Sequence, residues 1–461
     1  MAAPRVIVVG AGLAGTRAAE LLVAAGLRPL VVDEAPRSGG QIYRRQPEGF
    51  RRDARALYGT EAGRATALHA AFDALAGRID YWPETLAWNV RDRELHVLRG
   101  ESAHILPFDV LILATGATDR LVPLPGWTLP GVFSLGGAQI ALKAQACAIG
   151  SRVAFLGSGP LLYLVAAQYA KAGAAVAAVL DTAPASARWR ALPDMAARPS
   201  LLAKGAALLW TLRRAGVAVR RGVMPRRLLP DAEGARVAGI AIAGAGGAEE
   251  VIACDAAGLG WHLRAESQLA DLAGCGFAFD AEHRQWLPRA DEDGRSDVPG
   301  IYLAGDGARL LGADGAEIAG RLAALAALKD LGLPAPPGID IAGLRRRRRA
   351  MDRFRRGLAV AFPWPAALVA GLPDDTLVCR CEAITAGTLR RGGTGLDAPE
   401  VNRAKAFTRI GMGRCQGRFC GIAGAEILAA ARGVAMEGAG RLRGQAPVKP
   451  LPVAAVLDDA G

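Results

Sequence analysis

The feature that most constrains the fold is a glycine-rich turn near the start of the chain. A β-branched run, residues 5–9, leads into Gly10, Gly12 and Gly15 in the spacing Gly-x-Gly-x-x-Gly, and a helical stretch follows. This order of strand, turn and helix is the dinucleotide-binding fingerprint. Gly10 permits the tight turn, Gly12 lets a pyrophosphate approach, and Gly15 lets the helix pack closely on the strand. The sequence therefore predicts a Rossmann-like unit whose helix N-terminus is directed at phosphates.

An acidic pair follows the next strand. Residues 29–32 form a short apolar run that ends at Asp33 and Glu34. In the fingerprint, a carboxylate at this distance from the glycines accepts hydrogen bonds from the ribose hydroxyls. We therefore predict that Asp33 and Glu34 contact a nucleotide, and that the turn is a binding site rather than a chance run of glycines.

Two later apolar runs also end in glycines. One ends at Thr115 and Gly116, and the other contains Gly305 and Asp306. Each predicts a close backbone turn at the carboxyl edge of a parallel sheet, where ligands bind, although each alone is equally compatible with a structural strand end. Both runs resemble the remote signatures of the two-dinucleotide-domain flavoproteins. The resemblance implies that the nucleotide is FAD and that Asp306 contacts its ribityl chain.

A second unit of this kind lies in the middle of the chain. A strand at 151–156, Gly157 and Gly159, a helix, and a strand at 175–180 repeat the order of the first unit. A second Rossmann-like domain is thus predicted inside the first. Leu162 stands where the fingerprint has its third glycine, so this helix cannot approach its strand as closely. Two interpretations remain open, an altered or scaffolding site and an active NAD(P)H site, and the departure favours the first.

Four of the seven cysteines lie near the C-terminus, as Cys379-x-Cys381 and Cys415-x4-Cys420. Where thiols are kept reduced, such a group indicates a metal site rather than disulfides. The spacing fits structural zinc poorly and does not match the common ferredoxin runs. If Cys379 and Cys381 lie in an extended segment, their side chains share one face, and the glycine-rich loop lets the second pair converge on it. Zinc and four unconnected structural thiols remain the alternatives to an iron–sulfur centre.

The charges around these cysteines agree with a [2Fe-2S] cluster. An oxidised [2Fe-2S] core held by four thiolates is net negative, so nearby cations stabilise it. The segment supplies Arg380, Lys405, Arg409, Arg414 and Arg418. It resembles the bacterioferritin-associated-ferredoxin-like [2Fe-2S] module, and that resemblance implies that Cys379, Cys381, Cys415 and Cys420 are the ligands.

Composition excludes several other classes. The formal charge of +12 rests mostly on arginine and no nucleic-acid motif accompanies it, so we expect no nucleic-acid partner. No apolar run is long enough for a membrane span, and the first strand leaves no room for a signal peptide, so we expect a soluble cytoplasmic protein. No cysteine precedes Cys147. The cysteine pair of disulfide reductases is therefore missing, and Cys147, Cys254 and Cys275 are expected to be small core residues.

A basic run follows a proline-rich connector at 333–338. Arg345 to Arg349, Arg353, Arg355 and Arg356 alternate with apolar residues at helical spacing. The pattern predicts an amphipathic helix whose charged face is either solvated or docked onto an acidic partner protein. The run Phe362-Pro363-Trp364-Pro365 is expected to end this helix.

Together these patterns predict an α/β fold, a two-dinucleotide-binding-domain flavoprotein with a small C-terminal [2Fe-2S] domain. The expected parts are an FAD-binding domain at 1–118 and 286–332, an inserted NAD(P)-domain-like module at 119–285, a linker and basic helix at 333–375, the [2Fe-2S] domain at 376–440 and a tail at 441–461.

Nearly the whole chain resembles the α subunit of heteromeric flavin and [2Fe-2S] dehydrogenases, a family that includes D-hydroxyproline dehydrogenase, opine oxidases and hydrogen cyanide synthase. The runs 39–44, 379–382 and 405–420 carry this resemblance. It implies that Gly40 and Gln41 also contact FAD. It further implies that a D-hydroxyproline-, opine- or glycine-type amino or imino acid is oxidised on a partner β subunit, which resembles D-amino-acid oxidases and carries FAD. An FMN at the junction with the partner and a small ferredoxin-like γ subunit are implied as well.

A chain that holds both cofactors converts two-electron into one-electron transfer, because flavin accepts electron pairs and a [2Fe-2S] centre moves single electrons. No catalytic residue follows from the sequence, since the histidines are scattered and no nucleophilic triad is present. The alternative enzyme is an NAD(P)H-dependent ferredoxin-type reductase. The alternative from another class is an iron–sulfur interaction or assembly module, which the FAD fingerprint disfavours.

Overall fold

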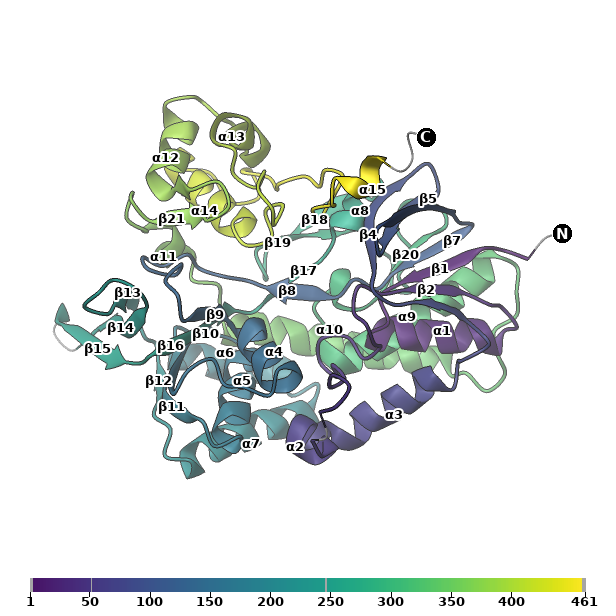
Figure 1. Cartoon of the computed structure of the whole chain (residues 1–461), viewed down its shortest axis with the longest axis horizontal. Helices are drawn as coiled ribbons and strands as arrows, with labels where there is room; N and C mark the ends of the chain where they lie inside the picture. Colours follow the sequence, from purple (N-terminus) through teal and green to yellow (C-terminus); the bar gives the residue numbers. More distant parts are fainter. Residues whose placement is uncertain (1–2, 51, 245–246, 458–461) are drawn as a thin grey trace.

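Two five-stranded parallel sheets form the body of the protein, and a small helical module lies beside them. The structure is a computed structural model that describes residues 3–50, 52–244 and 247–457. In Figure 1 the first sheet lies at the right, the second at the lower left, and the helical module above the second. None of the helices in the described residues combines the length and apolar character of a membrane span.

The first sheet has the predicted fingerprint strand at its centre. Its order is β20-β7-β1-β2-β3, and Val8 of β1 is in register with Val31 and Ile112, all three fully buried. The helices α1 and α9 pack on one face, where Gly320 is needed because a Cβ there would lie 2.0 Å from the Ala14 carbonyl oxygen. The elements are β1 (Val6–Val9), α1 (Leu13–Ala24), β2 (Leu30–Val32), β3 (Asp80–Trp82), β7 (Val110–Leu113), β20 (Ile301–Leu303) and α9 (Gly312–Asp330).

The other face of this sheet is covered by an antiparallel sheet, β4-β5-β6, and by α8. Leu95 and Val97 of β5 are completely buried against Leu111 of β7 and its neighbours. The elements here and between β2 and β3 are α2 (Ala54–Tyr58), α3 (Ala62–Asp73), β4 (Thr85–Arg91), β5 (Glu94–Arg99), β6 (Ser102–Pro107) and α8 (Gln268–Leu272).

The second sheet has the order β12-β11-β10-β16-β9 and confirms that one Rossmann-like unit is inserted into another. Two antiparallel strands, β8 and β17, connect the two sheets. The predicted domain boundaries stay a prediction. The elements are β8 (Ala117–Asp119), β9 (Val132–Ser134), α4 (Leu135–Ala144), β10 (Arg152–Ser158), α5 (Pro160–Lys171), β11 (Ala175–Asp181), α6 (Ala185–Met195), α7 (Pro199–Arg214), β12 (Val219–Arg221), β16 (Ala256–Trp261) and β17 (Leu263–Ala265). A small antiparallel sheet is formed by β13 (Pro225–Pro230), β14 (Val237–Ala243) and β15 (Glu249–Ala253).

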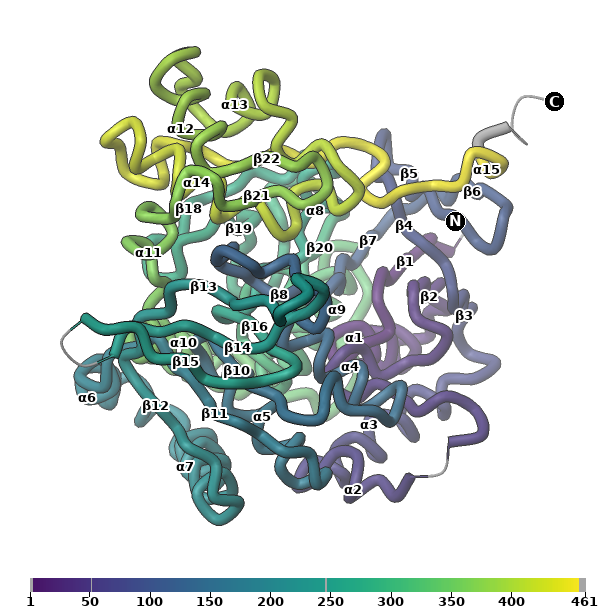
Figure 2. The backbone as a smooth tube through the Cα atoms, turned by 60° about the vertical axis from the view of Figure 1, so that its left-hand side comes forward, coloured from purple at the N-terminus to yellow at the C-terminus, as the bar shows by residue number. Residues whose placement is uncertain are grey.

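The C-terminal module is built around a short hairpin and three helices. Its elements, with the connecting ones, are β18 (Phe277–Asp280), β19 (Gln285–Pro288), α11 (Ala366–Ala370), β21 (Leu377–Cys379), β22 (Ile384–Thr385), α12 (Ala386–Thr394), α13 (Val401–Thr408), α14 (Gly421–Arg432) and α15 (Ala454–Leu457). From this module a C-terminal strap, residues 440–457, crosses the side of the first sheet and ends near β6 (Figure 2). Arg441 of the strap makes two hydrogen bonds to Asp271, of 2.6 and 2.7 Å.

The basic run forms the helix α10 (Ile341–Ala361), but neither predicted role of its arginines is correct. The side chains of Arg348 and Arg355 are 5% and 8% exposed, and Arg355 binds Asp280 at 2.5 Å. Further pairs join Arg345 to Asp293, Arg349 to Glu292 and Arg353 to Asp194. The arginines therefore fasten the helix to its own chain, because three separate loops place carboxylates along it.

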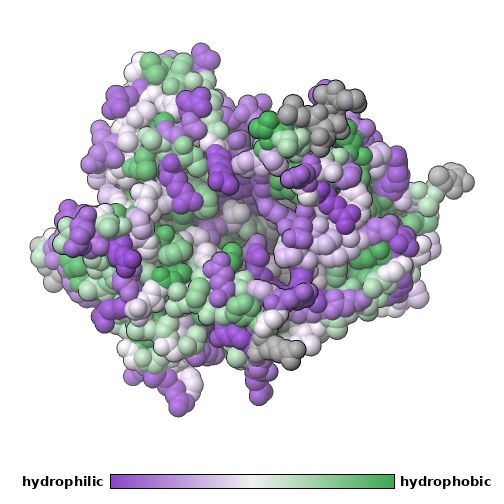
Figure 3. Space-filling model, in the orientation of Figure 1, coloured by the Kyte–Doolittle hydropathy of each residue, from purple (hydrophilic) through white to green (hydrophobic). Residues whose placement is uncertain are grey.

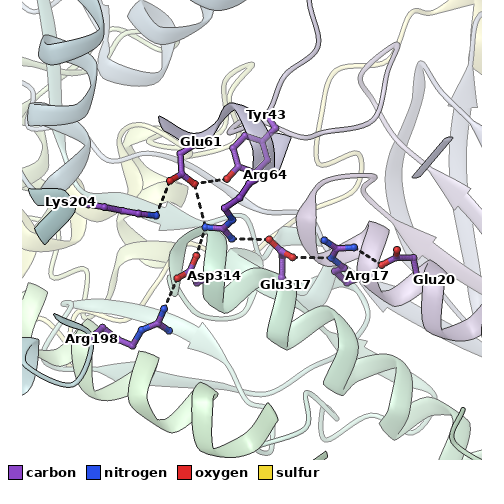
Figure 4. Close-up of polar contacts among 9 residues, drawn as sticks. All are labelled: Arg17, Glu20, Tyr43, Glu61, Arg64, Arg198, Lys204, Asp314 and Glu317. Atoms are coloured by element: carbon purple, nitrogen blue, oxygen red, sulfur yellow. Dashed lines mark hydrogen bonds and ion pairs between the residues drawn. The ribbon is translucent and has the colours of Figure 1, made fainter. Parts of the chain in front are cut away.

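A charged network connects the two Rossmann-like units beneath the first sheet (Figure 4). Arg64 binds Asp314 and Glu317 of α9, at 2.5 and 2.8 Å. Asp314 also binds Arg198, which precedes α7, at 2.6 Å, and Glu61 binds Lys204 of α7 at 2.8 Å. These shared carboxylates hold the inserted unit against the first one.

Candidate nucleotide site and cysteine centre

The first glycine turn has the shape that a bound pyrophosphate needs. A Cβ on Gly10 would lie 2.4 Å from the Ala114 carbonyl oxygen, and a Cβ on Gly15 would lie 1.7 Å from the Gly10 carbonyl oxygen, so both positions require glycine. Gly12 is the N-cap of α1 and no side chain caps this helix. The first N–H groups of α1 are therefore free to bind phosphate, as the fingerprint predicts.

The loop that contains Gly40 closes against this turn. A Cβ on Gly40 would lie 2.9 Å from the Gly12 Cα, and the Gly39 N–H donates to the Ala11 carbonyl at 2.9 Å. Gln41 is exposed and accepts a hydrogen bond from Arg44 at 2.7 Å. The structure thus brings Gly40 to the turn and leaves the Gln41 side chain at its rim.

The two predicted acidic contacts behave differently. Asp33 accepts hydrogen bonds from the N–H groups of Ala11, within the turn, and of Ala35. Burial raises the pKa of the Asp33 carboxyl above its usual value. Glu34 points away from the turn, is exposed, and pairs with Lys449 of the C-terminal strap. Only Asp33 therefore lies where a ribose would meet the turn.

The two remote runs also meet at the first turn. A Cβ on Gly305 would lie 2.9 Å from the Ala14 Cβ of α1, and one on Gly307 would lie 2.5 Å from the Thr115 Oγ1. Asp306 accepts hydrogen bonds at 2.8 and 2.9 Å from the N–H groups of the two residues that open α9. Thr115, Gly116, Gly305 and Asp306 therefore share one edge of the sheet with the glycine turn, and together these residues fit a dinucleotide.

The four cysteine sulfurs come together in the C-terminal module. Cys420 contacts both Cys379 and Cys415, and Cys415 also contacts Cys381. Cys379 ends β21 and is buried, whereas Cys381 is exposed and lies in the turn between β21 and β22. The expectation of one extended segment is thus wrong for Cys381, because the hairpin turns directly after Cys379. The other three cysteines stand apart, with Cys254 and Cys275 buried as predicted and Cys147 exposed, contrary to prediction.

Hydrogen bonds favour thiolates at this centre. The hydrogen bond with the Cys420 thiol lowers the pKa of Cys379 to about 6 and that of Cys415 to about 5. Main-chain N–H groups add to this effect, from Gly411 to Cys379 and from Phe419 and Gly417 to Cys415. The same hydrogen bonds raise the pKa of Cys420 well above its usual value. A cationic centre is what would let all four sulfurs lose their protons together.

The arrangement of the sulfurs fits a two-iron core better than a single zinc ion. Bonds of about 2.3 Å to a tetrahedral zinc ion would bring all four sulfurs within about 3.8 Å of one another. In the described residues, the only group of candidate ligand atoms that all lie within 4.8 Å of one another is that of Asp280, Glu282 and His283. The sulfurs instead form a row of pairwise contacts, Cys381 to Cys415 to Cys420 to Cys379.

Arg418 connects the cysteine loop to the edge of the nucleotide site. Its guanidinium donates to both carboxylate oxygens of Glu266, at 2.8 and 3.0 Å. The main chain of Glu266 in turn accepts a hydrogen bond from the Thr115 hydroxyl at 2.5 Å and donates to the Gly116 carbonyl at 3.0 Å. The Arg418 and Glu266 side chains are 10% and 13% exposed, so this connection is largely buried.

Comparison with known proteins agrees with this architecture. Residues 4–325 match the family described as pyridine nucleotide-disulphide oxidoreductase, and residues 393–459 match the sarcosine oxidase A3 domain. A subunit of opine oxidase from Rhizobium meliloti is 38% identical over 97% of this chain and 86% of its own length. The chain belongs to this family of opine oxidase subunits. The predicted family, its FAD-binding fold and its oxidoreductase class are thereby confirmed.

Two further proteins define the breadth of the opine oxidase family and of its fold. Hydrogen cyanide synthase subunit HcnB of Pseudomonas aeruginosa (strain PAO1) is 32% identical over 98% of both chains. L-proline dehydrogenase from P. horikoshii has a TM-score of 0.70 at 18% identity, over 99% of this chain and 79% of that one. The second likeness concerns the fold alone, and it spans both Rossmann-like units and the C-terminal module.

In this member of the opine oxidase family, the second glycine turn is covered by the chain itself. A Cβ on Gly159, the N-cap of α5, would lie 3.2 Å from the Nδ1 of His262. The Nε2 of His262 lies 2.6 Å from the Phe362 carbonyl oxygen. Phe362 is 8% exposed and its ring packs against those of Tyr163 and His262, with centroids 6.3 and 6.1 Å apart. The connector after α10 thus lies over the start of α5, where a nucleotide phosphate would bind.

The acidic residue of the second unit is also engaged. Asp181 ends β11, as Asp33 follows β2, but its side chain is fully buried. It accepts hydrogen bonds from the Tyr163 hydroxyl at 2.5 Å, from Arg188 at 2.6 Å and from the Ala183 N–H at 2.8 Å. Leu162, in place of the third glycine, is completely buried in the core behind α5. The structure therefore agrees with an altered site rather than an open one.

Sequence reasoning missed the residues that connect or close these sites. Asp181 carried a signal, because an acidic residue after the second strand is part of the fingerprint. Glu266, His262 and Phe362 carried none, because their partners lie 152 and 100 residues away in the chain. Of the predicted cations, Lys405 is buried and bonded to Gln445 at 2.8 Å rather than to a cysteine.

Proposed function

We propose that this chain is the electron-transferring α subunit of a heteromeric FAD and [2Fe-2S] dehydrogenase. In this proposal an amino or imino acid of the D-hydroxyproline, opine or glycine type is oxidised on a partner β subunit. The names of the relatives support an assembly, since opine oxidase and hydrogen cyanide synthase are both described by their subunits. A D-amino-acid-oxidase-like β subunit with its own FAD, an FMN at the junction between the two chains and a small ferredoxin-like γ subunit belong to the same proposal.

FAD accepts two electrons together and a [2Fe-2S] cluster passes them singly, which is the chemistry the two groups supply when bound. The glycine turn would hold the pyrophosphate, Asp33 the ribose and Asp306 the ribityl chain. The proposed FAD contacts are Gly10, Gly12, Gly15, Asp33, Glu34, Gly40, Gln41, Thr115, Gly116, Gly305 and Asp306. The proposed cluster ligands are Cys379, Cys381, Cys415 and Cys420, within the domain boundaries given by the sequence.

The observation that carries this proposal is the buried Arg418–Glu266 pair. Arg418 belongs to the loop between Cys415 and Cys420, and Glu266 holds the Thr115–Gly116 edge through its main chain. A doubly hydrogen-bonded pair of low exposure keeps both elements at a fixed separation. Such a fixed connection is what electron transfer between two neighbouring centres requires, and it has no purpose in a separate cluster-assembly module.

The covered second turn supports electron supply from a partner rather than from NAD(P)H. A nicotinamide nucleotide would have to displace Phe362 and His262 from the start of α5 and compete with Arg188 for Asp181. The ferredoxin-type reductase is therefore the weaker alternative.

Anaerobic mixing with NADH or NADPH tests this choice. We expect the purified chain to contain about two irons and two acid-labile sulfides, and its flavin to stay oxidised for minutes at millimolar nicotinamide. Dithionite should bleach both absorbances. Rapid bleaching at micromolar NADH would instead establish the reductase, and one zinc without sulfide would exclude the cluster.

Replacement of one ligand tests the cysteine assignment. Cys415→Ser should lower iron and sulfide at least several-fold, because an alkoxide is a poorer iron ligand than a thiolate. Protease sensitivity should rise within 377–432, since metal binding stabilises this region, while FAD stays bound. Cys147→Ser is the matched control and should keep both cofactors.

A further inference from the structure

The face of the C-terminal module around Cys381 differs from the rest of the cysteine centre. Three of the four cysteines are buried or half-buried, whereas Cys381 is exposed in the hairpin turn. Gly413 packs directly against it, since a Cβ on Gly413 would lie 2.3 Å from the Cys381 Cβ. The centre therefore reaches the surface at one point, next to the loop that follows α13.

Apolar side chains and arginines surround this point. Phe407 and Met412 are 42% and 36% exposed. Arg403 stacks over the Phe407 ring with its guanidinium carbon 4.8 Å from the centroid. We call the surface formed by Cys381, Arg403, Phe407, Arg409, Met412 and Arg414 the Cys381 face.

The charge of the Cys381 face is net positive. Arg403, Arg409 and Arg414 are exposed, and the Arg409 side chain is 65% exposed although it donates to Glu382 at 2.8 Å. Glu382 itself is only 19% exposed, so its carboxylate neutralises part of one arginine and adds little negative surface. Unlike the arginines of α10, which bind carboxylates of their own chain, Arg403 and Arg414 point to solvent. Figure 3 shows polar side chains with smaller apolar areas between them on the lobe that carries α12 and α13.

We propose that the Cys381 face is the docking site of an acidic one-electron carrier protein, of the ferredoxin or flavodoxin class. This inference rests on the proposed function. Charge complementarity identifies the partner, because an arginine-rimmed apolar centre selects a protein with acidic side chains around an exposed redox group. The small size of the face suits such a partner, since electron-transfer encounters bury little surface and dissociate quickly.

The electron balance is simple. Each docking event moves one electron, without a proton, from this chain to one oxidised carrier. Two carriers are therefore reduced for every two electrons that the substrate delivers, and the substrate's protons are released elsewhere. Arg403 and Phe407 position the carrier and take no part in the chemistry.

Binding of a strongly acidic plant-type [2Fe-2S] ferredoxin tests the face directly. Biolayer interferometry with the full chain should give micromolar affinity at 20 mM salt and at least tenfold weaker affinity at 200 mM, because exposed charges are screened. The double variant Arg403→Glu/Phe407→Ser should weaken binding at least tenfold. Arg213→Glu, an exposed arginine on α7 on the opposite side of the molecule in Figure 1, is the matched control and should bind like the wild type.

Stopped-flow transfer from the dithionite-reduced chain gives the second measurement. The second-order rate to ferredoxin should fall at least tenfold in the double variant, while the rate to a small neutral dye and the iron and sulfide content stay unchanged. Equal ferredoxin binding by the double variant and the wild type would overturn the docking site. Preference for basic cytochrome c, or binding to anionic vesicles without ferredoxin binding, would overturn it too. Absence of iron and sulfide in the wild type would overturn the proposed function instead, and the interferometry would still score the face.

Discussion

The two glycine turns of this chain share a backbone plan but differ in what surrounds them. At the first, Gly12 faces only the backbone of Gly40, so the start of α1 stays open. At the second, Gly159 faces the ring of His262, and Phe362 covers the start of α5. Both turns begin a helix without a side-chain cap. The fingerprint therefore specifies a fold, whereas the neighbouring side chains decide whether that fold admits a nucleotide.

The acidic residues of the two units show the same difference. Asp33 is bound by main-chain N–H groups at a half-exposed position, and within the described residues no salt bridge holds it. Asp181 is completely buried and carries Arg188 and Tyr163 as partners. A ribose can approach the first carboxylate without breaking an ion pair. At the second it would have to displace a buried one, which is costly.

Branched side chains at the two turns should separate them most strongly. Gly12→Val places methyl groups in the open space before α1, and we expect FAD content to fall at least tenfold. Gly159→Val meets only His262 and should leave FAD bound. FAD per chain after gel filtration measures both. Full FAD in the first variant would remove the distinction.

The Asp181 ion pair provides the next effect in size. Arg188→Met leaves a buried carboxylate without its cation, and we expect a loss of about 3–5 kcal/mol in the free energy of unfolding of the middle unit. Asp181→Asn in the same background should restore part of this loss, since the uncompensated charge is gone. Urea unfolding of the single and double variants checks the coupling, and additive losses would show that the pair is not a unit.

Removal of the covering ring should cost stability without creating a nicotinamide site. Phe362→Ala removes a ring packed against Tyr163 and His262, and we expect a loss of about 3 kcal/mol. NADH should still fail to bleach the flavin, because Asp181 remains engaged. If bleaching appears in Phe362→Ala alone, the connector is the sole barrier and the second turn is a closed but intact site.

A pH effect of His262 should be the smallest. Burial lowers the pKa of His262 to about 4, below the ordinary value near 6.5. The folded protein therefore holds the neutral ring, and its stability is complete above pH 6.5 and declines as the pH falls toward 4. We expect a decline of about 1 kcal/mol between pH 7 and 5 that is reduced in His262→Gln. Equal declines in both proteins would place the sensitive group elsewhere.

The sequence predicted the glycine turns well because their requirements are local. A Cβ on Gly15 would collide with a residue five positions earlier, so the constraint is visible in the spacing itself. The grouping of the four cysteines was visible for a similar reason, since each pair lies within one short loop. The prediction was wrong where a partner came from elsewhere, as for the arginines of α10 and for Cys381.

By itself, the sequence determined the strands, the helices, the nesting of two Rossmann-like units and the pairs of cysteines. These follow from hydrophobic period and turn chemistry, which act over a few residues. Only the tertiary structure decided which glycine turn is open and how the cysteine loop reaches the first site. Phe362 covers a helix begun at Gly159, and Arg418 binds a glutamate 152 residues away. Such contacts depend on shape and charge across packed elements, and no local pattern records them.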